Sequence, residues 1–112
     1  TREMLALDHR PTAIMTASMI SALGVRRAIE DAGLVMGRDV SVVTHDDALS
    51  YLRNGGDIPI FTATRSSVRE AGRRLAEMLL SEISEPSETP PNQLLEAELM
   101  VGLSTGPAPK DI

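Results

Sequence analysis

The fold is decided by residues 11–47, which read PTAIMTASMISALGVRRAIEDAGLVMGRDVSVVTHDD. The apolar run from Ala13 to Ala17 is short enough for a strand. Ser18 is a favoured residue for the start of a helix and Gly33 for its end, so the sequence predicts a helix of about four turns between them. Val40 to Val43 is a β-branched run without polar alternation, which predicts a parallel strand covered on both faces. Strand, helix and strand in this order form a right-handed βαβ unit.

The rest of the chain continues the α/β pattern. Residues 48–59 contain Asn-Gly-Gly and a proline and are typical of a long loop, followed by a predicted strand, IFTATR, over 60–65. Ser67 with Glu70 three residues later forms a capping-box pattern, which predicts a second helix from there to about Ile83. A polar, proline-bearing connection leads to a last predicted strand over 93–103. The fold class is therefore α/β with a parallel sheet.

Composition excludes several functional classes. The 112 residues carry a formal net charge of -5, which argues against direct binding of this segment to the phosphates of nucleic acid. There is no cysteine, so disulfides and zinc-thiolate sites are excluded. No apolar run approaches the roughly 20 residues of a membrane span, and the sequence predicts no membrane contact. Because the chain begins with Thr1, we expect it to be a fragment of a longer protein.

Two adjacent acids, Asp46 and Asp47, follow the predicted strand at 40–43. The carboxyl ends of parallel strands are where open α/β sheets bind ligands, and successive side chains on a strand point oppositely, so only one acid can face a given crevice. An ionised carboxylate accepts hydrogen bonds from two hydroxyls, which favours a ligand-binding role for Asp46. Two alternatives are a metal site with His45 and an α/β enzyme that uses Asp46 as a base, although the latter lacks a readable partner group. An aspartyl-phosphate receiver is excluded because the only lysine is Lys110, and no phosphate-binding G-x-x-x-x-G-K-[ST] loop is present.

The first helix carries three large apolar residues on the side that otherwise holds its charged residues: Met19, Ile20 and Leu23. Such a patch is typical of a contact surface. The alternative is that the loop over 48–59 covers it. The sequence leaves a subunit interface and a loop contact as equal possibilities.

Three ordered blocks resemble the C-terminal part of LacI/GalR transcriptional regulators: RPTAIMTASMISALG…DVSVVTHDD, then FTATRSSVREAGRRLAEMLL, then LLEAELMVGLSTGP. The resemblance covers nearly the whole chain. It implies an incomplete periplasmic-binding-protein-like module, with residues 11–58 in the C-terminal subdomain, 60–84 as a crossover strand and helix, and 93–103 as a return strand. The helix after Ser67 would pack on the other subdomain. A DNA-binding helix-turn-helix would precede the region covered by these 112 residues.

The resemblance also implies roles for single residues. Asp46 matches the first acid of the family's GFDD motif, which accepts hydrogen bonds from effector hydroxyls. Ser18 matches an asparagine that reaches the effector, although serine at this position is also an ordinary helix cap. Val68 matches an apolar position lining the cleft, and its helix face explains it equally well as a core residue. Leu23 matches a leucine in the family's homodimer contact.

Other positions depart from the family pattern. Met19 stands where the family has an aspartate, Thr44-His45 stands where it has a glycine and an aromatic residue, and Gly102 stands where an arginine is frequent. Sugar binders usually stack the ring on aromatic side chains, and this chain offers only Tyr51 and Phe61. These departures concern the positions nearest to the expected effector.

The resemblance implies a cytoplasmic, non-enzymatic module without a cofactor, which senses a sugar or sugar derivative for a homodimeric repressor. Operator DNA would be bound by a separate N-terminal domain and not by this segment. The alternative is a transport-type sugar-binding protein of the same fold, since a fold alone does not determine function. Dimerisation through Leu23 would distinguish the two, because transport receptors generally act as monomers.

Overall fold

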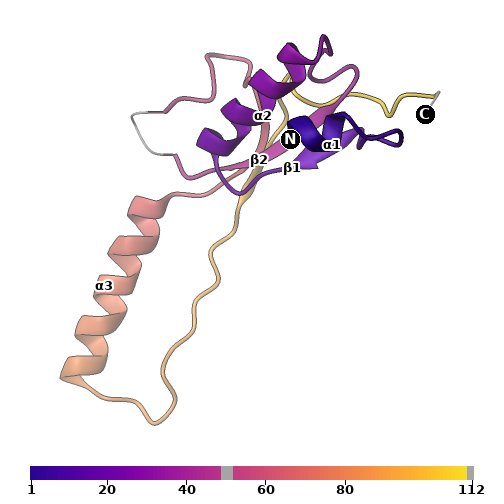
Figure 1. The fold of residues 1–112 in the computed structure, drawn as a ribbon. Coiled ribbons are helices and arrows are strands. Elements are labelled where there is room, and N and C mark those ends of the chain that lie inside the picture. The colour runs from indigo at the N-terminus through magenta and orange to yellow at the C-terminus, as the bar shows by residue number, and fades with distance from the viewer. Residues whose placement is uncertain (49–51, 111–112) are drawn as a thin grey trace.

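The βαβ unit predicted for residues 11–47 forms the centre of the molecule (Figure 1). The computed structural model describes residues 1–48 and 52–110. Strand β1 (Ala13–Met15), helix α2 (Met19–Asp31) and strand β2 (Ser41–Asp46) follow one another, and β1 pairs with β2 in parallel. A short helix, α1 (Arg2–Leu5), precedes them and contacts α2.

The sheet has four strands in the order β1-β2-β3-β4. Strand β3 (Thr62–Arg65) is parallel to β2, and β4 (Glu98–Met100) returns antiparallel to β3. The α/β fold class with a mostly parallel sheet is confirmed. The last strand is much shorter than the predicted 93–103, because only Glu98, Leu99 and Met100 pair with β3.

Helix α2 begins and ends at the residues that the sequence predicts. The Ser18 hydroxyl accepts a hydrogen bond from the backbone N–H of Ser21 (3.3 Å), and Gly33 has a left-handed φ of +71° just after the helix. One face of α2 packs on the sheet and forms the core, whose buried members are Met19, Ala22, Val25, Ile29, Val40, Val42 and Phe61. The sequence-based placement of Met19 on the water-facing side is therefore wrong. It is 6% exposed and belongs to the core.

Only one face of the sheet is covered by the described residues. Side chains of β2 alternate between half-buried and buried, with Val42, Thr44 and Asp46 on the side of α2. The prediction that this strand is covered on both faces is wrong for the described chain. On the opposite face Met15 and Leu99 are 82% and 63% exposed. Parallel sheets are normally covered on both faces, whereas this face is uncovered within residues 1–48 and 52–110.

The segment after β4 is fixed to the sheet by hydroxyl groups. Ser104 is fully buried; its hydroxyl accepts from the Thr62 N–H (2.8 Å) and donates to the Val42 carbonyl. The Ser104 carbonyl accepts from the Val42 N–H (2.8 Å), and the Thr62 and Thr105 hydroxyls are hydrogen-bonded at 2.7 Å. These contacts tie the C-terminal segment to both central strands.

Substitution of Gly37 by alanine is expected to destabilise the protein by about 3 kcal/mol. Gly37 has a left-handed φ of +83°, and an added Cβ would collide with the backbone carbonyl of Leu103. The control is Gly72→Ala, in a helix and with open space at its Cβ, which we expect to be neutral or stabilising by about 1 kcal/mol. Denaturant unfolding of both variants measures the difference, and equal stabilities would contradict the expectation.

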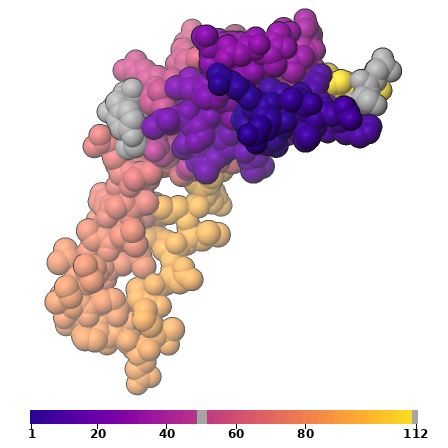
Figure 2. Space-filling view, viewed as in Figure 1, coloured from indigo at the N-terminus to yellow at the C-terminus, as the bar shows by residue number. Residues whose placement is uncertain are grey.

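Helix α3 (Val68–Ser84) extends away from the sheet, and the chain returns beside it to β4 (Figure 1). Figure 2 shows the helix and the returning segment as an arm projecting from the body of the molecule. Its N-cap is Ser67, as predicted, with the Glu70 N–H donating to the Ser67 hydroxyl (3.1 Å). No residue of α3 is buried by the described residues, and its large apolar side chains Leu75, Leu79, Leu80 and Ile83 are all more than 60% exposed. The arm therefore has an amphipathic helix without a partner in this part of the chain.

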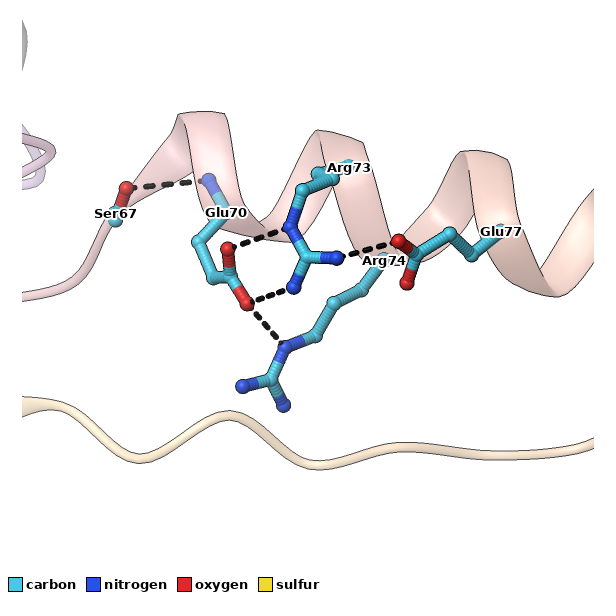
Figure 3. A network of polar contacts seen from close by, with 5 residues as sticks. All are labelled: Ser67, Glu70, Arg73, Arg74 and Glu77. Atoms are coloured by element: carbon cyan, nitrogen blue, oxygen red, sulfur yellow. Dashed lines mark hydrogen bonds and ion pairs between the residues drawn. The ribbon is translucent and has the colours of Figure 1, made fainter.

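Ion pairs line the polar face of α3 (Figure 3). Glu70 binds Arg73 (2.6 Å) and Arg74 (2.7 Å), and Arg73 also contacts Glu77. The hydrogen bonds from Arg73 and then Arg74 lower the pKa of Glu70 to about 2 from an ordinary value of 4.5. In a complete capping box the Glu70 carboxylate would also accept a hydrogen bond from the Ser67 N–H. That hydrogen bond is absent among the described residues, because the carboxylate binds the two arginines instead.

We expect the Glu70 carboxylate to stabilise α3 at neutral pH and to lose this effect in acid. The pKa of Glu70 is lower in the folded helix, so its stabilisation is complete above about pH 4.5 and is lost as the pH falls toward 2. Carboxylate NMR shifts should place the Glu70 midpoint near 2, and salt should raise it because the pairs are exposed. The Glu70→Gln variant should lose less helix than wild type when the pH falls from about 4.5 toward 2. A Glu70 midpoint near 4.5 at low salt would contradict the network.

Candidate functional site

Asp46 is a buried acid at the carboxyl end of β2. Its side chain is on the α2 side of the sheet, and the residue is 6% exposed. The Oδ1 atom accepts a hydrogen bond from the N–H of Ala48 (2.9 Å), which holds Ala48 at a left-handed φ of 58°. The expected separation of the two acids is observed in burial, since Asp47 is less buried than Asp46. Of the two acids, Asp46 is the one that lines a cavity.

Arg65 forms a long ion pair with Asp46. The two residues are register partners on β2 and β3, so parallel pairing places them side by side at the same strand end. The distance from Arg65 Nε to Asp46 Oδ2 is 4.0 Å, which is longer than a hydrogen bond. The Arg65 side chain is 49% exposed. Sequence reasoning missed Arg65, because the strand register that sets it beside Asp46 has no local signal in the sequence.

Asp46 and Arg65 line a cavity of about 280 Å³. The cavity is bordered by the loop after β2 and by the ends of β3 and β4. Its lining residues are Asp46, Ala48, Leu52, Arg53, Asn54, Gly55, Gly56, Asp57, Pro59, Arg65 and Met100. Asn54 is engaged within the protein, because its amide bonds both the N–H (2.8 Å) and the carbonyl (2.7 Å) of Phe61. The remaining charged groups of the lining, beside apolar surface, are two acids and two arginines: Asp46, Asp57, Arg53 and Arg65. This lining suits a small polar molecule with both donors and acceptors.

The two residues before Asp46 have structural partners. Thr44 is buried and its hydroxyl accepts from the Thr16 hydroxyl (2.8 Å), which joins β2 to the end of β1. His45 is on the other face of the sheet, with Nδ1 2.9 Å from the Thr64 hydroxyl and Nε2 3.1 Å from the Ser66 hydroxyl. Within residues 1–48 and 52–110 no group of three acids or histidines could hold a metal ion. The hypothesis of a metal site at His45, Asp46 and Asp47 therefore finds no support among these residues.

Ser18 and Val68 lie outside the cavity in this part of the chain. Ser18 follows β1 and is half-buried at the same edge of the sheet as Asp46, where its hydroxyl caps α2 and hydrogen-bonds the Ser21 hydroxyl (3.1 Å). Val68 is the first residue of α3 and is 50% exposed, so the described residues do not bury it in a core. Neither residue lines the cavity at Asp46. Their expected effector contacts stay predictions.

The exposed patch on α2 is smaller than the sequence suggests. With Met19 in the core, it consists of Ile20 (67% exposed) and Leu23 (42% exposed). The described residues 52–59 of the following loop line the cavity at Asp46 instead, apart from Ile58. Ile20 and Leu23 therefore stay exposed in the part of the chain that the structure describes.

The aromatic residues give no stacking platform in the described chain. Phe61 is fully buried in the core. Tyr51 lies outside the described residues.

None of the helices in residues 1–48 and 52–110 is long and apolar enough to cross a membrane.

Comparison with known proteins places this geometry in a family. The family model of the periplasmic binding protein-like domain matches residues 1–105. The chain is 46% identical over 99 residues to the HTH-type transcriptional regulator AglR of Rhizobium meliloti (strain 1021), and the match covers 88% of this chain and 28% of that protein. It is 35% identical over 100 residues to the lactose operon repressor of Escherichia coli (strain K12), covering 89% of this chain and 27% of the repressor. The chain thus spans little more than a quarter of the length of these relatives.

A solved structure shows the same fold. The crystal structure of a LacI family transcriptional regulator from Bifidobacterium animalis subsp. lactis superimposes with a TM-score of 0.79 at 26% identity, over 96% of this chain and 38% of that one. These relatives are transcriptional regulators rather than enzymes or transport proteins, which does not favour the transport-type alternative. The chain belongs to the periplasmic binding protein-like domain family, and its relatives within that family are the LacI-family regulators.

Proposed function

We propose that this chain is the effector-sensing and dimerisation part of a transcriptional repressor, and that its effector is a sugar or sugar derivative. The observation that carries the proposal is the buried Asp46, which lines a cavity with one carboxylate oxygen, Oδ2, outside hydrogen-bonding distance of any described residue. Because no described buried side-chain oxygen lacks a hydrogen bond, this oxygen is open to the cavity, where a carboxylate oxygen can accept a hydrogen bond from a ligand. A hydroxyl-rich ligand supplies the donor.

The wider architecture is part of the proposal. Residues 11–58 belong to one subdomain, 60–84 cross to a second subdomain, and 93–103 return. The exposed apolar side chains of α3, represented by Leu75 and Leu79, support this division because they need a partner. The effector would bind between the subdomains, with Asp46 on one side and Ser18 and Val68 nearby. Effector binding would shift subdomain closure and so change operator affinity.

The partners follow from the same proposal. Two copies associate in the cytoplasm through the α2 patch of Ile20 and Leu23, and a separate domain binds operator DNA. The acidic balance of this segment supports a role away from DNA. The relatives, which are HTH-type regulators by name, support the assignment to transcription.

Calorimetric titration with a panel of neutral mono- and disaccharides tests the proposed function. We expect at least one sugar to bind one site per chain and to change the affinity of the protein for its operator. The same titration with linear alkanediols of similar size is the control for non-specific contact. Failure of every sugar in the panel to bind would overturn the proposed effector class.

A further inference from the structure

Arg65 has an unused donor group directly beside the Oδ2 atom of Asp46. Their Cα positions are register partners on neighbouring parallel strands, and both side chains line the same cavity. At 4.0 Å from Asp46 Oδ2, the Arg65 Nε is close enough for electrostatic attraction and too far for a hydrogen bond. Neither group therefore satisfies the other.

The Arg65 guanidinium makes no side-chain hydrogen bond among the described residues, although Glu98 is its register partner on β4. The arginines of α3 are paired differently, since Arg73 and Arg74 both bind Glu70. Arg65 also borders a second cavity of about 720 Å³ between the start of α3 and the returning segment. It thus lies at the point where the chain leaves β3 for α3, and its planar donors remain available.

We propose that Arg65 is an effector-binding residue and that, with Asp46, it recognises two adjacent hydroxyl groups on one ligand. This inference rests on the proposed function. One hydroxyl donates its proton to Asp46 Oδ2, and the oxygen of the neighbouring hydroxyl accepts from the Arg65 guanidinium. The ligand bridges two groups that are separated by 4.0 Å and do not bond each other.

The chemistry selects a vicinal diol over a single hydroxyl. A carboxylate only accepts hydrogen bonds and a guanidinium only donates them, so the pair needs a ligand with both functions side by side. Adjacent hydroxyls of a sugar ring meet this requirement without bringing a net charge. The ligand class is therefore a sugar that presents an unsubstituted vicinal diol.

A comparison of one sugar and its deoxy analogues tests the assignment. The sugar that binds the wild-type protein most tightly in calorimetry is titrated beside its single-deoxy analogues, into wild type and Arg65→Met. We expect Arg65→Met to weaken binding of the parent sugar by about 10- to 100-fold, the effect of losing a hydrogen bond to a charged group. One deoxy analogue should bind wild type and Arg65→Met with equal affinity, because the contact is already missing. Arg69→Met removes the same charge from an exposed position of α3 and should leave affinity unchanged.

The outcomes separate the two proposals. Tight sugar binding that is equal in wild type and Arg65→Met would overturn the role of Arg65 and leave the proposed function in place. An equal loss in Arg69→Met would reduce the effect to net charge and also overturn the assignment. Absence of sugar binding to the wild-type protein would overturn the proposed function, and the diol assignment with it.

Discussion

Substitution of Asp46 by asparagine is expected to weaken effector binding by about 100-fold while leaving the fold intact. The carbonyl oxygen of the new side-chain amide can replace Oδ1 as acceptor for the Ala48 N–H, so the turn after β2 keeps its hydrogen bond. The Oδ2 position becomes an amide donor that faces the ligand's hydroxyl and the nearby Arg65. Loss of a charge-assisted acceptor and its replacement by a donor amount to about 3 kcal/mol. Calorimetry with the sugar found in the panel measures the loss.

The matched control is Asp47→Asn, which makes the same chemical change one residue later. Adjacent residues of an extended chain point oppositely, and Asp47 does not line the cavity at Asp46. We expect less than about a threefold change in affinity for this variant, because Asp47 lies outside the cavity lining. Thermal unfolding should show that Asp46→Asn remains folded. Equal affinities of the two variants would contradict the assignment of Asp46.

The βαβ centre could be predicted because its signals are local. Ser18 caps α2 through its own hydroxyl, and Gly33 supplies a backbone conformation that other residues rarely adopt. The position of Asp46 at a strand end also follows from a short segment of sequence. Such features depend on residues three or four positions apart, which a single sequence displays directly.

Met19 shows where a helical wheel gives the wrong answer. It is three residues before Ala22, and hence at the edge of the apolar face, in the first turn where the chain arrives from β1. Its long, unbranched side chain can reach the sheet from that edge, and it is 6% exposed. Ile20 is about 100° further around the helix and stays 67% exposed. The helical wheel places Met19 and Ile20 in one exposed patch, whereas packing buries Met19 and leaves Ile20 exposed.

Arg65 and the uncovered sheet face depend on distant parts of the chain. Asp46 meets Arg65 only because β2 and β3 pair in one register, and the loop between them gives no local signal for that register. The run Val40–Val43 predicts cover on two faces, but only α2 supplies it within the described residues. The role of His45 could not be predicted for the same reason. Its hydrogen-bond partners Thr64 and Ser66 are 19 and 21 residues away in the sequence.

Substitution of Leu23 by arginine is expected to convert the proposed dimer to a monomer without unfolding the chain. Leu23 is 42% exposed, so the fold of one chain accommodates the arginine in solvent. In a two-fold symmetric dimer the same patch is used by both copies, and each dimer would bury two unpaired guanidinium groups near Ile20 and its counterpart. We expect dimer affinity to fall by at least about 100-fold, as for loss of an interface hot spot.

The control for Leu23→Arg is Val35→Arg, an equivalent change at a residue that follows α2 and is 45% exposed. Sedimentation equilibrium should give a monomer for Leu23→Arg and a dimer for Val35→Arg and wild type, at equal helix content. A Leu23→Arg dimer of unchanged affinity would remove the α2 patch from the interface. Dissociation of both variants would show that added charge, and not the patch of Ile20 and Leu23, controls association. The pair of variants therefore tests the surface itself, because α2 retains its buried face of Met19, Ala22 and Ile29 in each of them.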